Sequence, residues 1–146
     1  MTTFITRPKS KISKAETGLR RFVFRDISLK GLSHPLTGDL TTVSDYHAVS
    51  QSIKNIVLTN KKERFFDHIE FGVGIEHYLF KIFDSGLTDL LKEDILIELS
   101  KYEPRAFYNN IYVNGTASKH QLEIQIEFTI KTTNVADTVT ILIERT

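Results

Sequence analysis

The sequence predicts an α+β domain in which three helices pack on one face of a small antiparallel sheet of about three strands, after an extended N-terminal arm. Apolar residues recur with a helical period between residues 44 and 101, and they alternate with polar residues from Gln121 to Lys131. Before about residue 20 neither pattern is present. With 146 residues the chain is long enough to bury a core of its own.

Residues 1–20 are predicted to be a basic arm, and residues 21–146 a single domain. The first thirty residues carry eight basic and two acidic side chains, a net charge of +6, whereas the remainder carries −5. A basic arm before an acidic body predicts either a solvated terminus or docking on an acidic partner. The basic residues are scattered and have few aromatic neighbours, which does not favour nucleic acid as that partner.

The first part of the domain is predicted to be a short strand followed by a turn. Phe22–Phe24 is predicted to be this strand or an anchor, and the residues from Gly31 to Leu40 are predicted to be loop. Within that loop Pro35 fixes φ at the second position of a tight turn. Gly38 then takes a backbone conformation that other residues resist.

The first helix is predicted over Ser44–Asn60, with Ser44 as the N-cap and Asp45 placing negative charge at the helix start. Its apolar face follows the spacing i, i+4, i+7 and i+8, and consists of Val49, Ile53, Ile56 and Val57. After a loop that contains Phe65 and Phe66, Gly72 and Gly74 predict a close bend into the next helix.

Two further helices are predicted, a short one over Ile75–Phe83 and a longer one over about Leu87–Lys101. Pro104 ends the longer helix, because the residue before a proline avoids the helical region. The predicted buried stripe of the longer helix is Leu87, Leu90, Leu91, Ile95 and Leu99.

The last third of the chain is predicted to form the sheet. In the central strand the predicted inward residues are Leu122, Ile124, Ile126, Phe128 and Ile130. Phe107, Ile111 and Val113 share parity in the strand before it, and Val139, Ile141 and Ile143 in the strand after it. Asn114-Gly115 is a turn signal between the first two strands.

Several kinds of chemistry find no support in the sequence. There is no cysteine, which excludes disulfides and thiolate chemistry, and no apolar run approaches the ~20 residues of a membrane helix. The five histidines lack the i, i+4 spacing of a helical metal site, so we expect no metal. No nucleophile elbow, phosphate-binding glycine loop or identifiable carboxylate pair is present, so we expect no cofactor and no catalytic residues. Glu103 is the one acid in a distinctive context, because Glu103 and Arg105 flank Pro104 and point to one side of an extended segment.

Several short motifs, in a fixed order, together resemble the baseplate wedge protein family of contractile phage tails. This family is also called the sheath initiator and has a counterpart in type VI secretion baseplates. The matching residues are Pro35, Thr37, Gly38, Asp39 and Leu40; Ser44, Asp45, Ala48, Val49, Ser52, Ile53, Asn55, Ile56, Leu58 and Thr59; Glu63, Arg64 and Phe66; Phe71, Gly72, Gly74 and Ile75; Leu79 and Phe80; and Glu103, Pro104 and Arg105.

The resemblance implies a structural subunit of the virion tail baseplate, assembled in the host cytoplasm, rather than an enzyme. It implies six copies around the tail tube, near the hub, that join other baseplate wedge proteins and start the tail sheath. Some members are described as lysozyme-like, so a peptidoglycan hydrolase stays the alternative function. A type VI secretion baseplate is the alternative setting.

Two segments are the candidate assembly sites. Glu103, Pro104 and Arg105 are expected to bind at a joint between helix and sheet, or to contact the wedge. The sheath protein is expected to add a strand to an edge of the sheet, either near Phe107 to Val113 or at the last strand, which has no proline and little charge to prevent pairing. The candidate residues of the last strand are Val139, Thr140, Ile141, Leu142, Ile143 and Glu144.

Overall fold

The computed structural model describes residues 23–31, 33, 35–64, 70–79, 81, 84–116 and 121–144. The predicted arm and Phe22 lie outside these residues. The elements in chain order are β1 (Arg25–Ile27), β2 (Thr42–Ser44), α1 (Tyr46–Leu58), α2 (Glu76–Leu79), α3 (Ser85–Tyr102), β3 (Ala106–Thr116), β4 (Gln121–Ile130) and β5 (Ala136–Glu144). The prediction of three helices and a mixed α and β architecture is confirmed.

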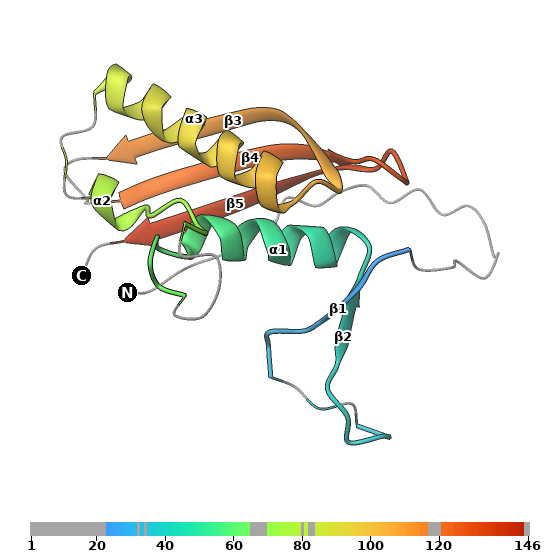
Figure 1. Cartoon of the computed structure of the whole chain (residues 1–146). Coiled ribbons are helices and arrows are strands. Elements are labelled where there is room, and N and C mark those ends of the chain that lie inside the picture. Colours follow the sequence, from blue (N-terminus) through green and yellow to red (C-terminus); the bar gives the residue numbers. More distant parts are fainter. Residues whose placement is uncertain are drawn as a thin grey trace.

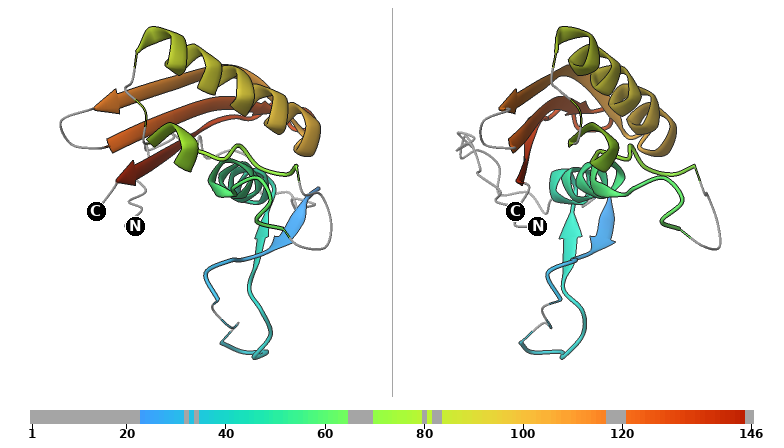
Figure 2. Two further views of the ribbon diagram at one scale, coloured as in Figure 1. Left: turned by 60° about the vertical axis from the view of Figure 1, so that its left-hand side comes forward. Right: turned by 90° about the vertical axis from the view of Figure 1, so that its left-hand side faces the viewer.

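The main sheet has three antiparallel strands in the order β3-β4-β5, so β4 is central and β3 and β5 are its edges (Figure 1). A separate two-stranded sheet pairs β1 with β2. The helices α1 and α3 lie on the same side of the main sheet, and the hairpin β1–β2 projects away from this body (Figure 2). Among the described residues, no helix is both long enough and apolar enough to cross a bilayer.

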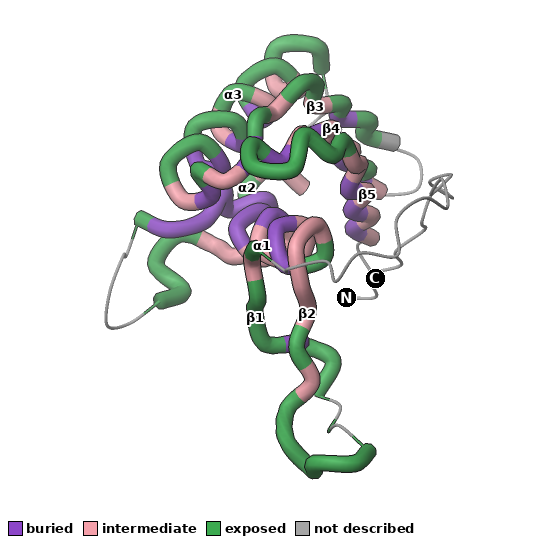
Figure 3. The backbone as a smooth tube through the Cα atoms, turned by 90° about the vertical axis from the view of Figure 1, so that its right-hand side faces the viewer, coloured by how far each residue is buried: buried purple, intermediate pink, exposed green. Residues whose placement is uncertain are grey.

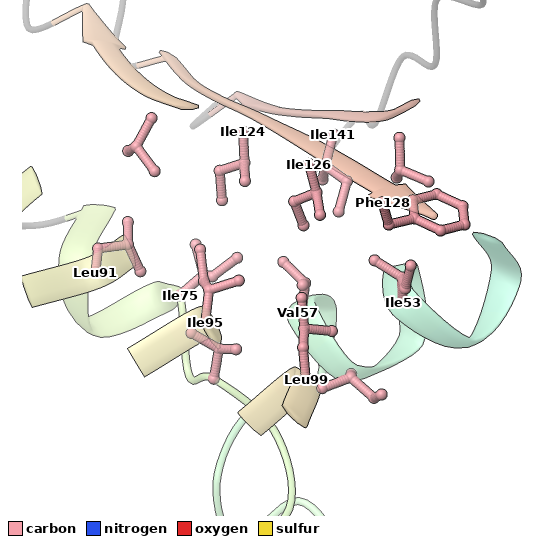
Figure 4. Close-up of a cluster of buried hydrophobic side chains, with 14 of the residues drawn as sticks. Ile53, Val57, Ile75, Leu91, Ile95, Leu99, Ile124, Ile126, Phe128 and Ile141 are labelled. Atoms are coloured by element: carbon pink, nitrogen blue, oxygen red, sulfur yellow. The ribbon is translucent and has the colours of Figure 1, made fainter. Parts of the chain in front are cut away.

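One apolar cluster holds residues from α1, α3 and all three strands of the main sheet. The five predicted inward residues of β4 are all fully buried, and Val139, Ile141 and Ile143 of β5 are at most 2% exposed. Figure 4 shows Ile53, Val57, Ile95 and Leu99 of the helices facing the isoleucines of β4 and β5. Strict alternation therefore identified the buried face of the sheet.

The helical period also identified the buried faces of the helices, except that Leu87 is only half-buried and Leu90 is exposed. The four apolar residues predicted for α1 are buried, together with Ala48. In α3, Leu91, Ile95 and Leu99 are buried as predicted, but Leu90 is 58% exposed. Successive residues of a helix point about 100° apart, so Leu90 and Leu91 cannot both face the sheet.

The start of α1 differs from the prediction, because Ser44 belongs to β2 and Asp45 occupies the N-cap position. The Asp45 carboxylate makes no cap hydrogen bond in α1. It instead accepts hydrogen bonds from the N–H groups of Val23 and Phe24, at 2.9 and 3.3 Å. Asp45 therefore fixes the base of the hairpin, and the first strand of the described residues is Arg25–Ile27, so Val23 and Phe24 precede it.

The hairpin is also bound to α1 by one side chain. Gln51 donates a hydrogen bond from Nε2 to the Ile27 carbonyl at 2.8 Å, and its Oε1 accepts one from the Leu29 N–H at 3.2 Å. The amide thereby replaces the partner strand that the outer edge of β1 lacks. Beyond this anchor the hairpin is mostly exposed (Figure 3), and Pro35–Thr37 form the predicted turn, followed by Gly38 with φ of 69°.

Two predictions for β3 are wrong. The register shifts between Tyr108 and Asn110, which marks a β-bulge at Asn109. The extra residue reverses the parity, so Phe107 is 60% exposed while Val113 is buried. The predicted turn at Asn114-Gly115 is instead regular strand paired with β4, and the connection between β3 and β4 falls at residues 117–120, outside the described residues.

The glycines before α2 close the end of α1. The N–H of Val73 donates to the Ile56 carbonyl and the N–H of Gly74 to the Thr59 carbonyl, both at 3.3 Å. Gly72 has φ of 101°, and a Cβ atom there would lie 2.2 Å from the Thr59 oxygen. The predicted close bend is therefore confirmed, although α2 is shorter than predicted, and Phe80, Ile82 and Phe83 lie outside the described residues.

Gly72→Ala should be strongly destabilising, because it combines a strained backbone angle with a clash against backbone. Gly74→Ala is the matched control, since Gly74 has φ of 74° but a Cβ atom would meet nothing closer than 3.6 Å. Strain and overpacking each cost about 1–3 kcal/mol, so we expect Gly72→Ala to lower the free energy of unfolding by about 2 kcal/mol more than Gly74→Ala. Equal losses in urea denaturation would contradict the close approach.

Candidate functional site

The segment Glu103-Pro104-Arg105 turns the chain from α3 into β3. The helix ends at Tyr102, where Pro104 predicts its end, and the Glu103 N–H still donates to the Leu99 carbonyl at 2.9 Å. Two residues later the Arg105 carbonyl accepts a hydrogen bond from the Lys131 N–H at 3.0 Å, so the chain is already in register with the sheet. The three residues therefore form the joint between helix and sheet.

Glu103 and Arg105 form a bidentate ion pair across the proline. The Arg105 Nε donates to Glu103 Oε1 at 2.6 Å, and Nη2 donates to Oε2 at 2.5 Å. Glu103 is 1% exposed, whereas the Arg105 side chain is 30% exposed. The paired planar geometry is the strongest form of a side-chain ion pair, and here one partner is removed from water.

Side chains from three other positions contact this pair. The hydroxyl of Ser52 in α1 hydrogen-bonds to the Glu103 carboxylate. The hydroxyl of Tyr108 in β3 donates to the Glu103 carbonyl at 2.9 Å. The guanidinium carbon of Arg105 lies 5.2 Å from the ring centroid of Phe24, at the base of the hairpin. The ion pair therefore connects the joint to α1 and to the hairpin as well as to the sheet.

The electrostatics of the site favour a charged carboxylate. Burial acts to raise the pKa of Glu103, but the hydrogen bonds from Arg105 and Ser52 and the charge of Arg105 outweigh it, so the pKa lies below its ordinary value. The hydrogen bond to Glu103 raises the pKa of Arg105 further. Burial, and then the charge of Glu103, raise the pKa of Tyr108, which stays a donor. An acid catalyst would require the opposite shift at Glu103.

The second candidate segment, β5, is an edge of the main sheet, with β4 as its partner. The Ile130 N–H donates to the Val135 carbonyl. With this register, the backbone N–H and C=O groups of the odd-numbered residues of β5 point toward β4. The backbone N–H and C=O groups of Thr138, Thr140 and Leu142 therefore point outward from the sheet. No strand of the described chain pairs with them.

A cleft of about 220 Å³ opens beside the joint. Its lining residues are Leu96 and Ser100 of α3, then Pro104, Ala106, Phe107 and Tyr108, and finally Lys131. None of these lining residues is a carboxylate. Among the described residues there is also no group of three or more His, Asp or Glu side chains that could hold a metal ion.

Sequence reasoning identified Glu103 and Arg105 but missed three of their neighbours. Ser52 falls within a helical segment, Tyr108 is five residues after Glu103, and Phe24 is far from both in sequence. None of them has a local pattern that predicts its contact with the pair. The exposure of Phe107 was missed because a bulge leaves no periodic signal.

The sequence model of the family described as baseplate wedge protein gp25 matches residues 43–135. This range contains α1, α3, β3 and β4 and the joint at Glu103-Pro104-Arg105. A comparison with curated proteins found no match.

Two solved structures share the fold. The structure of a proposed tail lysozyme from Geobacter sulfurreducens superimposes with a TM-score of 0.61 and 23% identity, over 68% of this chain and 90% of that chain. A chain of the cryo-EM baseplate of the anti-feeding prophage superimposes with a TM-score of 0.65 and 20% identity, over 73% of this chain and 85% of that chain. At these identities the likeness establishes the fold alone.

Arg105→Ala should destabilise the domain, because it leaves the Glu103 carboxylate buried without its partner. Breaking a buried pair in this way costs about 3–5 kcal/mol, whereas an exposed pair contributes about 0–1 kcal/mol. Lys92→Ala is the matched control, since Lys92 forms an exposed pair with Asp89 at 3.1 Å. A loss below 1 kcal/mol for Arg105→Ala in chemical denaturation would show that the pair is not a structural joint.

The same pair should make stability depend on acidity. The pKa of Glu103 is lower in the folded state than its ordinary value of 4.5, so the unfolded chain takes up the proton first as pH falls. The stabilisation is complete above the ordinary value and is lost as pH falls through the folded-state value. The stability advantage over Glu103→Gln should therefore shrink between neutral pH and about pH 3. A constant difference across that range would refute this linkage.

Proposed function

Because the chain belongs to the baseplate wedge protein gp25 family, we propose that it joins the wedge around the tail tube of a contractile tail and initiates the sheath. Membership of the family carries this proposal, and it supports a structural role in a baseplate. The finer assignments rest on the family resemblance. They are six copies per baseplate, contacts with wedge, tube or hub proteins, and assembly in the host cytoplasm before the chain becomes part of the tail.

The two edges of the main sheet are not equally suited to accept a strand from the sheath protein. β5 pairs with β4 over nine consecutive residues without a register shift. β3 is interrupted by the bulge at Asn109, and bulges weaken an edge as a template for further pairing. We therefore assign sheath pairing to β5, where the outward backbone groups of Thr140 and Leu142 can extend the sheet, whereas the Thr138 N–H already donates to the Asp137 carboxylate at 2.8 Å.

The ion pair of Glu103 and Arg105 has an internal role in this proposal. It fixes the angle between α3 and the sheet, and thus the position of the edge strands relative to the helices. Pro104 and the partly exposed Arg105 side chain lie at the surface of the joint, where a wedge protein can contact them. The Glu103-Pro104-Arg105 segment thereby links the surface that contacts a wedge protein to the sheet whose edge strand β5 meets the sheath.

A peptidoglycan hydrolase is the second candidate function, because one structure with this fold is described as a proposed tail lysozyme. A glycosidase requires a carboxylic acid with a raised pKa close to a second carboxylate. Glu103 has a lowered pKa and is bonded to Arg105, which favours the structural role. Release of peptidoglycan fragments by the purified protein, abolished in a folded Glu103→Gln variant, is the result that would favour the enzyme.

Thr140→Pro should prevent sheath growth without unfolding the domain. The Thr140 N–H points away from β4, so a proline there removes no hydrogen bond within the sheet and blocks pairing with an added strand. We expect electron micrographs of particles carrying this variant to show complete baseplates without polymerised sheath.

Gly115→Pro is the matched control, because its N–H points outward from β3, the opposite edge. We expect that variant to form normal sheath. Normal sheath on Thr140→Pro baseplates would exclude strand addition at β5, and loss of sheath with Gly115→Pro alone would move the pairing to β3.

A further inference from the structure

The cleft beside the joint is lined by both apolar and polar groups and lies at the edge of the sheet opposite β5. We call it the α3–β3 cleft and define it by Leu96, Pro104, Phe107 and Lys131. Leu96 is 43% exposed and Phe107 is 60% exposed, so two large apolar side chains face water here. Large apolar side chains exposed beside a cleft are typical of a protein-binding site.

The bulge at Asn109 creates this surface. Without the extra residue, Phe107 would share the inward parity of Ile111 and Val113 and would join the core. With it, Phe107 turns to the outer face, where its ring centroid lies 4.6 Å from the Lys131 ammonium nitrogen. Bulges commonly re-aim a side chain in this way next to a functional site.

The lining of the α3–β3 cleft carries a positive charge. Lys131 is the only charged residue that lines it, and within the described residues no carboxylate pairs with Lys131. A cation held over an exposed aromatic ring favours a partner that brings a carboxylate to the same place.

The volume of the cleft restricts what it can hold. Pockets for small molecules measure about 300–1,000 Å³, and this cleft, at about 220 Å³, is smaller. It suits a single large side chain, which is the usual anchor at the centre of a protein interface.

We propose that the α3–β3 cleft binds a segment of another baseplate subunit that carries one large apolar side chain next to an Asp or Glu. The apolar side chain would fill the space between Leu96 and Pro104, and the carboxylate would pair with Lys131. This inference rests on the proposed function, since it requires the chain to be part of a baseplate. The cleft and β5 lie at opposite edges of the sheet, about 10 Å apart across two strand spacings, so this partner and the sheath can bind together.

Photo-crosslinking in assembled particles tests the contact directly. The full chain would carry p-benzoylphenylalanine in place of Phe107, which keeps an aromatic ring at that position. Leu36 is the matched control position, because it is 90% exposed and lies in the projecting hairpin. After illumination we expect position 107 to crosslink to one other baseplate polypeptide, through a peptide that contains an apolar residue beside Asp or Glu, and position 36 not to crosslink to it.

Charge reversal tests the chemistry of the contact. Lys131→Glu should reduce incorporation of the chain into particles at least tenfold, and Lys131→Arg should retain it. Lys30→Glu, an exposed lysine of the hairpin, is the matched control and should incorporate normally. Thermal melting of the purified variants distinguishes lost binding from lost folding, and we expect melting temperatures close to that of the unchanged chain.

The outcomes separate this inference from the proposed function. A chain that is present in baseplates but crosslinks at position 107 to nothing, or only to sheath protein, would overturn the inference and leave the baseplate role intact. Normal incorporation of Lys131→Glu would overturn it as well. Absence of the unchanged chain from purified baseplates would instead overturn the proposed function.

Discussion

The ion pair between Glu103 and Arg105 is the interaction on which the arrangement of the elements depends. A carboxylate that is 1% exposed is stable only if its charge is compensated, and here the compensation comes from an arginine two residues away and from Ser52 of α1. The charge therefore requires α1, the end of α3 and the start of β3 to meet at one place. Apolar packing alone would not impose so specific a geometry, because it is not directional.

Much of the fold could be predicted from the sequence because buried residues recur at regular spacings within a strand or a helix. Each inward residue of β4 was identified by alternation, and the buried face of α1 by its helical spacing. The joint was identified because a proline and two opposite charges form a short local pattern. In these places local preference and tertiary packing agree.

The errors fall where a tertiary contact competes with a local rule. Aspartate commonly caps helices, yet the Asp45 carboxylate accepts hydrogen bonds from the N–H groups of Val23 and Phe24 in the hairpin. Asn-Gly is a common turn sequence, yet Asn114 and Gly115 pair with β4 as part of β3. Phe107 was misplaced by one inserted residue. Such contacts join residues that are distant in sequence or depend on register, so one sequence carries no local signal for them.

The order of elements along the chain has a consequence for how the domain opens and closes. α3, β3, β4 and β5 are consecutive, and β4 pairs with β3 and β5 with β4. α1 and the hairpin reach this unit through contacts between distant residues, such as Ser52 with Glu103. Closing long loops costs chain entropy, so we expect the C-terminal half to form first and the N-terminal half to detach first in native-state fluctuations. Amide protons of β4 should then exchange with solvent more slowly than those of α1, although both elements contribute fully buried residues to the core.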